Sequence, residues 1–65
     1  MRYLDIIVPV KNEAENLNDL VRRVHSSLNE ASISHQIIFI DDHSTDSTLE
    51  VLNKLAKDFP VKVYT

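Results

Sequence analysis

The stretch that decides the fold is IIFIDDHS, residues 37–44, in which a wholly apolar run ends in two adjacent aspartates. Residues 37–40 combine β-branched and aromatic side chains with no polar alternation. Such a run is typical of a buried parallel strand that helices cover on both faces. Two neighbouring carboxylates repel each other and gain nothing from burial, so we expect Asp41 and Asp42 to begin a functional loop at the strand end.

Two further strands and two helices are predicted around this stretch. Residues 4–8 (LDIIV) read as a strand ending at Pro9, which cannot donate to a β ladder, and residues 61–64 (VKVY) alternate like a strand nearer the sheet edge. The order β-α-β-α-β predicts an α/β fold with a three-stranded parallel sheet and right-handed crossovers. The two helices are predicted from apolar residues at helical spacing, which are Leu17, Leu20, Val21, Val24 and Leu28, then Leu49, Leu52, Leu55, Ala56 and Phe59.

The helix starts carry capping signals. Asn12 and Glu15 have the spacing of a capping box, which places the start of the first helix near Glu13. Pro60 ends the second helix. The candidate caps of that second helix are Ser44, Asp46 and Ser47, and Ser47 also has capping-box spacing with Glu50.

Composition excludes several classes of protein. The 65 residues form a single segment, 1–65, without cysteine, and a net charge of −3 argues against nucleic-acid binding. No apolar run approaches the ~20 residues that span a bilayer, and Asp5 and Pro9 interrupt the stretch a signal peptide would need, so we expect a cytoplasmic location. The chain has no glycine, which excludes a dinucleotide-binding turn and a P-loop.

Polar residues follow the first two strands at the edge where ligands of open parallel sheets bind. Residues 9–13 and 41–46 are therefore expected to line one crevice. Carboxylates at Asp41 and Asp42 can accept hydrogen bonds from a ligand's N–H or ribose hydroxyls, or hold a divalent cation. Lys11 is a candidate for contact with phosphate.

A simpler interpretation remains for each of these residues. One aspartate would cap the following helix, Asn12 and Glu13 would serve the positive end of the first helix, and Lys11 would only be solvated. The three histidines lack the i, i+4 spacing of a helical metal site. Of them, His43 lies beside the acidic pair, whereas His25 and His35 are expected at surface or boundary positions.

The segments IIVPVKNE (6–13) and IFIDDHSTDST (38–48), about thirty residues apart, resemble the start of family 2 glycosyltransferases. Within that family they are most similar to polyprenyl-phosphate sugar transferases such as the dolichyl-phosphate mannose synthases. The resemblance implies the N-terminal half of a GT-A (Rossmann-like) fold and an inverting transfer from a nucleotide-diphosphate sugar. It implies nucleotide-sugar contacts from Pro9, Val10, Lys11, Glu13, Asp41 and Asp42.

The chain departs from the family at two positions and lacks one motif. The family often has an aromatic residue where Lys11 stands and glycine where His43 stands, and glycine tolerates a positive φ there. Its Asp-x-Asp motif, which holds Mg²⁺ or Mn²⁺ and the diphosphate, has no counterpart in these residues. We therefore expect these residues to be the N-terminal segment of a longer enzyme at the cytoplasmic face of a membrane. The segment by itself is expected to bind no cation and to transfer no sugar.

Two alternatives of other classes stay open. A receiver-like signalling domain also places an acidic pair after an apolar strand to bind magnesium, although there the pair follows the first strand. A non-catalytic α/β module would only oligomerise through the exposed edges of its sheet. Homo-oligomers formed through these edges are also expected under the glycosyltransferase interpretation.

Overall fold

The computed structural model describes residues 3–65 and has five elements in the order β-α-β-α-β. They are β1 (Tyr3–Val10), α1 (Ala14–Glu30), β2 (Ser34–Asp41), α2 (Thr48–Asp58) and β3 (Val61–Tyr64). The predicted fold class is confirmed. The first two strands are longer than predicted because each supplies the other with backbone partners along its polar ends as well as its apolar centre.

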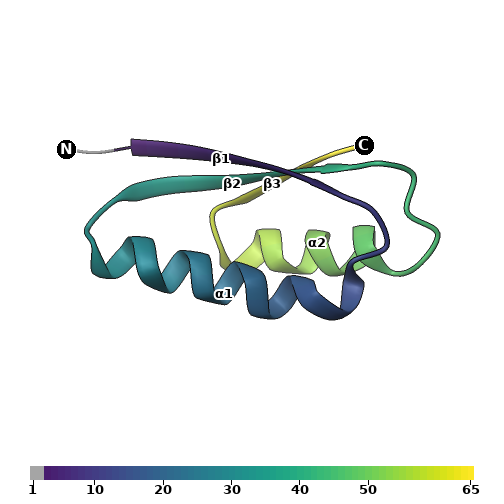
Figure 1. Ribbon diagram of the computed structural model, residues 1–65, viewed down its shortest axis with the longest axis horizontal. Helices are drawn as coiled ribbons and strands as arrows, with labels where there is room; N and C mark the ends of the chain where they lie inside the picture. Colours follow the sequence, from purple (N-terminus) through teal and green to yellow (C-terminus); the bar gives the residue numbers. More distant parts are fainter. Residues whose placement is uncertain (1–2) are drawn as a thin grey trace.

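All three strands are parallel, and β2 lies between β1 and β3. β1 and β2 pair from Tyr3 opposite Ser34 to Val10 opposite Asp41. Each helix runs back beneath the sheet to the start of the next strand (Figure 1). The loops after β1 and β2 therefore meet at one end of the molecule, and the α1–β2 turn lies at the other.

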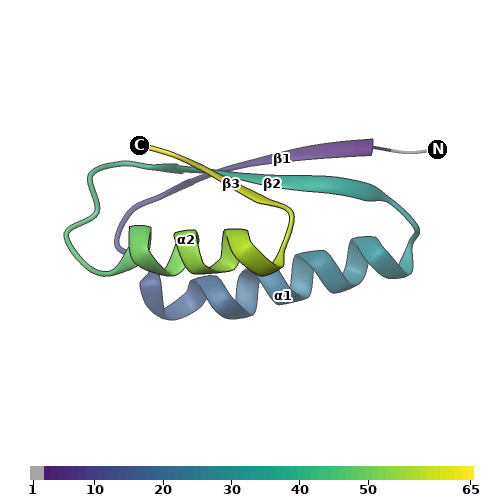
Figure 2. The same ribbon diagram turned by 180° about the vertical axis from the view of Figure 1, so that it is seen from behind.

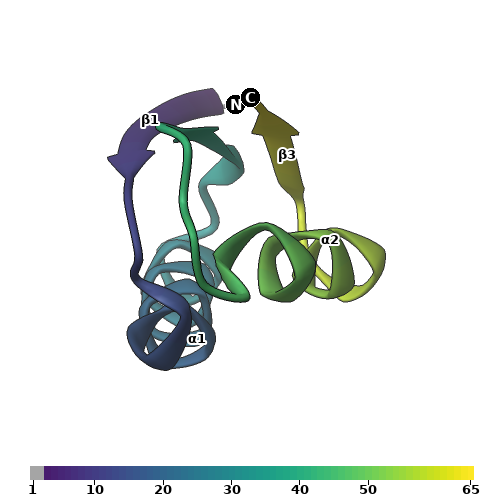
Figure 3. The same ribbon diagram turned by 90° about the vertical axis from the view of Figure 1, so that its right-hand side faces the viewer.

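Both helices cover the same face of the sheet, as the end-on view in Figure 3 and the rear view in Figure 2 show. The prediction that helices would cover both faces of residues 37–40 is therefore wrong. Two successive right-handed crossovers that step the same way across a sheet place their helices on one side. On the opposite face Ile7 is 63% exposed and Ile40 is 43% exposed.

The hydrophobic core fills the layer between the sheet and the two helices. Phe39 lies at the centre of β2 and is 0% exposed, because alternate residues of this strand face the helices. The predicted helical stripes are confirmed in their central residues, whereas Leu20, Leu49 and Ala56 lie at exposed margins. The core consists of Val10, Leu17, Val21, Ile37, Phe39, Leu52, Leu55 and Val61.

Neither helix begins with the predicted capping box. Glu13 is the N-cap of α1 and Ser47 is the N-cap of α2, and neither side chain makes a capping hydrogen bond. Asp46 instead accepts the backbone N–H of Thr48 at 2.9 Å, so it is the one predicted cap that bonds to the start of α2. Among residues 3–65, neither helix combines the length and the apolar character needed to cross a bilayer.

Candidate functional site

The loops that follow β1 and β2 lie side by side at the carboxyl end of the sheet (Figure 1). Val10 and Asp41 end their strands directly opposite each other. The backbone N–H of Asp42 then donates to the carbonyl oxygen of Val10 at 2.9 Å, which carries the pairing one residue further. The predicted meeting of the acidic pair with the segment from Pro9 to Glu13 is confirmed.

Asn12 bridges the two loops in both directions. Its backbone N–H donates to Oγ of Ser44 at 2.9 Å, and its Oδ1 accepts the backbone N–H of Thr45 at 2.8 Å. Asn12 has a φ of 52°, in the left-handed region that asparagine tolerates better than most residues. This bridge replaces the capping role predicted for Asn12, and it fixes the position of one loop against the other.

Thr48, the first residue of α2, is 0% exposed and hydrogen-bonds to both loops. Its Oγ1 accepts the backbone N–H of Glu13 at 2.9 Å, and its hydroxyl donates to the carboxylate of Asp46. This hydroxyl is the main reason that the pKa of Asp46 lies below the usual value of a carboxyl. The sequence indicated Thr48 only as part of a polar helix start, because its partner Glu13 is 35 residues away.

The two adjacent aspartates have different environments. Asp41 is 7% exposed, shares the helix-covered face of β2 with Phe39, and accepts the hydroxyl of Ser44. Asp42 is exposed, and within residues 3–65 its carboxylate has no hydrogen bond or ion pair. A ligand that approaches this edge of the sheet therefore meets the carboxylate of Asp42, while that of Asp41 is already engaged.

The other predicted site residues divide into exposed and buried positions. Pro9 is exposed near the end of β1, and Lys11 and Glu13 are exposed on the loop that follows. The carboxylate of Glu13 accepts the side-chain amide of Asn16 at 3.2 Å. Val10 is buried in the core and is placed to support the loop rather than to face a ligand.

His43, beside the acidic pair, has a φ of 52°. The family resemblance assigns glycine to this position, and the structure confirms that its backbone adopts the left-handed conformation that glycine favours. A non-glycine residue there costs about 1–2 kcal/mol.

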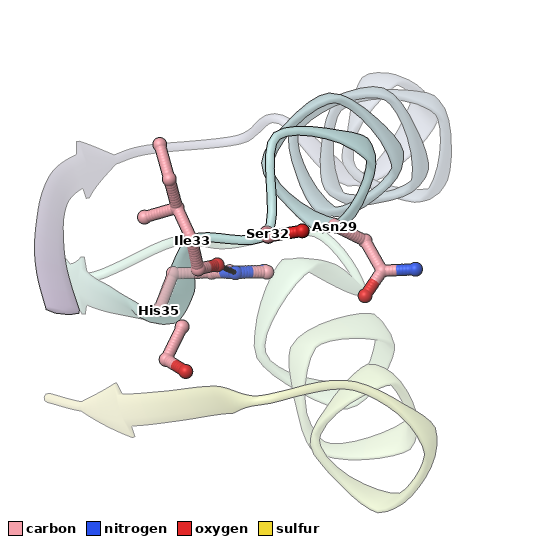
Figure 4. A pocket seen from close by; sticks show the side chains of 5 residues that line it. Asn29, Ser32, Ile33 and His35 are labelled. Atoms are coloured by element: carbon pink, nitrogen blue, oxygen red, sulfur yellow. Dashed lines mark hydrogen bonds between the residues drawn. The ribbon is translucent and has the colours of Figure 1, made fainter. Parts of the chain in front are cut away.

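The site is an exposed rim made of residues 9–13 and 41–46. The hydrogen bonds of Asn12 to Ser44 and Thr45 occupy the space between its two loops. Of three cavities in the described chain, one reaches the second loop, since Ser44 and Asp46 line it together with residues of α2. The other two lie on α1 and beside the α1–β2 turn, the latter of about 400 Å³ and lined by residues such as Asn29 and His35 (Figure 4). Within residues 3–65 no three His, Cys, Asp or Glu side chains converge as metal ligands would. The residues described here therefore do not fit the divalent cation that the resemblance implies.

Comparison with known proteins places these loops in a family. Residues 5–65 match the family model described as glycosyl transferase family 2. The chain is 37% identical over 60 residues to a dolichol-phosphate mannosyltransferase of Pyrococcus furiosus, covering 92% of this chain and 16% of that protein. It is 33% identical over 58 residues to an undecaprenyl-phosphate 4-deoxy-4-formamido-L-arabinose transferase of Salmonella choleraesuis, covering 89% of this chain and 18% of that protein.

A second undecaprenyl-phosphate 4-deoxy-4-formamido-L-arabinose transferase, from Pseudomonas savastanoi pv. phaseolicola, is 30% identical over 57 residues, with 88% of this chain and 17% of that protein covered. The chain thus spans 16–18% of the length of these curated relatives. The family match includes both loops of the rim and all five elements except the first residues of β1. The chain belongs to glycosyl transferase family 2.

Proposed function

We propose that the rim formed by the first two loops binds the nucleoside part of a nucleotide-diphosphate sugar, as the donor-binding segment of an inverting glycosyltransferase. The observation that carries this proposal is the exposed carboxylate of Asp42, which has no protein partner within residues 3–65. It lies beside a loop that the bridge of Asn12 holds in place. A carboxylate that is held in position and has no hydrogen bond within the protein suits a ligand that carries hydrogen-bond donors.

The chemistry of the exposed side chains suggests how the donor would lie. A carboxylate only accepts hydrogen bonds, so Asp42 suits a base N–H or the ribose hydroxyls and repels phosphate. Lys11 supplies a positive charge on the neighbouring loop, toward which the diphosphate would point. Pro9 offers an exposed apolar surface for the base. In this arrangement Asp41 and Val10 support the rim from beneath.

Sugar transfer itself is proposed to need residues other than those described here. When bound, the divalent cation expected in the family neutralises charge on the leaving diphosphate, and its ligands are proposed to lie in the longer part of the relatives that this chain does not match. We therefore expect the 65-residue chain to form no glycosylated product from UDP-glucose or GDP-mannose with a polyprenyl phosphate and Mg²⁺ or Mn²⁺. Product that appears with time in a radiolabelled-sugar assay would contradict this expectation.

The acceptor and the location are part of the same proposal. The relatives are named for transfer to dolichol phosphate and undecaprenyl phosphate, so a polyprenyl phosphate is the acceptor class we propose for the whole enzyme. Such an acceptor would place the enzyme at the cytoplasmic face of a membrane. Association of copies through the free edges of β1 and β3 stays a prediction.

Binding by Asp42 is tested by titrating the ¹⁵N-labelled chain with UDP-glucose and, in a separate series, with GDP-mannose. We expect shifts of backbone resonances confined to the loops after β1 and β2 with the donor that fits. Replacement Asp42→Asn removes the charge and one acceptor oxygen, and it is expected to raise the dissociation constant about tenfold or more.

The matched control is Asp58→Asn, which makes the same change of charge at the far end of α2. It should leave the dissociation constant within about twofold of the original, because screened charges more than ~10 Å apart interact weakly. Equal binding by the original chain and the Asp42→Asn variant would remove Asp42 from the site. An unchanged spectrum with both donors would overturn the proposed function.

A further inference from the structure

Two histidines that the sequence placed at unrelated boundary positions are in contact at the other end of the molecule. Nδ1 of His25 on α1 lies 3.0 Å from Nε2 of His35 on β2, and both rings are partly buried. Nδ1 of His35 in turn lies 3.0 Å from the carbonyl oxygen of Ile33. A hydrogen bond between these two side chains therefore joins the second half of α1 to the start of β2.

The acceptor at one end determines where the hydrogens lie. A carbonyl oxygen only accepts, so Nδ1 of His35 carries the hydrogen. In neutral His35 the Nε2 atom is then an acceptor, and Nδ1 of His25 must be the donor. The contact therefore requires His25 to hold its hydrogen on Nδ1 when both rings are neutral.

One added proton preserves this bond and a second one breaks it. If His35 gains a proton on Nε2, it donates to His25, whose own hydrogen moves to Nε2, and the bond becomes charge-assisted. If both rings are charged, two N–H groups and two positive charges face each other across 3.0 Å. We propose that the histidine pair is a pH-sensitive clasp between α1 and β2 that accepts one proton and opens on the second.

The surrounding groups do not compensate for a second charge. On α1 the charged neighbour is Arg22, whose guanidinium lies 5.9 Å from the ring centre of Phe59, and that ring packs edge-on against His25 at 5.3 Å. On β1 the residue opposite His35 is Leu4, and the residues beside His35 on β2 are uncharged. At the end of α2 the charged residues are Lys57 and Asp58.

No carboxylate of the described chain forms an ion pair with either ring, since the one ion pair found within residues 3–65 joins Asp19 and Arg23. The cavity of about 400 Å³ beside the α1–β2 turn gives solvent access to the His35 side of the clasp. His35 lines this cavity together with Asn29, Ser32, Ile33 and Ser34 (Figure 4). Protons can therefore exchange with solvent without unfolding of the chain.

The direction of the pH dependence follows from counting protons. Between about pH 8 and pH 5 an unfolded chain can bind a proton on each of the two histidines, whereas the clasp as proposed stays closed with one proton only. Stability therefore falls as pH falls through this range, because the unfolded state takes up the extra proton. The limit for a difference of one proton is a tenfold loss in the ratio of folded to unfolded chain per pH unit.

NMR of the imidazole nitrogens of the unmodified chain tests the clasp directly. At pH 7.5 we expect Nδ1 of both His25 and His35 to carry hydrogen, and on acidification we expect one proton to be taken up by the pair before unfolding begins. Hydrogen on Nε2 of neutral His25, or two independent one-proton titrations in a chain that stays folded, would overturn the proposal.

Urea unfolding at a series of pH values provides a second measurement. The variants His25→Gln and His35→Gln each leave a single histidine of the pair, so the ratio of folded to unfolded chain should vary less with pH than in the unmodified chain. The control His43→Gln changes the exposed third histidine and should keep the original pH dependence. Identical pH dependence in the unmodified chain and His25→Gln would contradict the clasp.

Discussion

Replacement of Phe39 by alanine is expected to unfold the chain at 25 °C. Phe39 is 0% exposed at the centre of β2, where it contacts the cluster between the sheet and both helices. Truncation of a buried phenylalanine costs about 3–5 kcal/mol, and a single core of this size rarely supplies more than about 3–5 kcal/mol in total. Loss of the far-UV circular dichroism of the folded chain and of a cooperative urea transition would show the effect.

Two matched variants separate burial from a general sensitivity of β2. Phe39→Leu keeps most of the buried volume and should cost less than about 1.5 kcal/mol, so that a urea transition remains. Ile40→Ala removes the neighbouring side chain, which is 43% exposed on the uncovered face, and should cost clearly less than Phe39→Ala. A Phe39→Ala chain with the original urea midpoint would show that the core does not depend on β2.

The variant Thr48→Val is expected to lower the free energy of unfolding by about 2 kcal/mol. Valine matches the shape of threonine but has no hydroxyl, so the backbone N–H of Glu13 loses its partner and Asp46 loses a donor. An unpaired donor at a partly buried position costs about 1–3 kcal/mol. The same change should increase hydrogen exchange at the amide of Glu13 and loosen the rim near Lys11.

The pH dependence of this variant identifies which bond is lost. The pKa of Asp46 is lowered chiefly by the hydroxyl of Thr48, so this interaction stabilises the fold above the ordinary carboxyl value. It is lost as pH falls through the pKa of Asp46 in the folded chain, below about pH 4. The difference in stability between the original chain and Thr48→Val should therefore narrow in acid without vanishing, since the bond from Glu13 does not titrate.

The matched control for the hydroxyl is Thr48→Ser, which keeps both bonds and removes one buried methyl. It should cost about 1 kcal/mol and leave exchange at Glu13 slow. A Thr48→Val chain with unchanged stability and unchanged exchange at that amide would show that the two loops are held together without Thr48.

Much of the rim could be predicted from the sequence because its positions follow from strand ends. Asp41, Asp42 and the segment from Pro9 to Glu13 each come directly after an apolar run, and parallel neighbouring strands bring such ends together. The difference between the two aspartates was also readable in part. Asp41 has the same parity along β2 as Phe39, which places it on the covered face if the strand continues to that residue.

The hydrogen bonds that join the two loops of the rim, and the contact of the histidine clasp, are not predicted by any local sequence pattern. The spacing of Asn12 and Glu15 is that of a capping box, and the side chain of Asn12 can cap a helix. In the structure, however, its amide oxygen accepts the backbone N–H of Thr45 in the second loop instead. The bond between Glu13 and Thr48 and the contact between His25 and His35 join residues whose partners are set by how helices pack on the sheet. Side-chain pairing across such distances depends on tertiary geometry, which no window of sequence contains.

The order of residues by itself determined the five elements, the parallel sheet and the meeting of two polar loops at one edge. It could do so because the periods of helix and strand and the direction of a crossover are local properties of an L-amino-acid chain. The tertiary structure alone decided that both helices share one face, that Ser44 engages the carboxylate of Asp41, and that His25 meets His35. These outcomes depend on which of several competing partners comes within about 3 Å, and that is settled only when all the elements pack together.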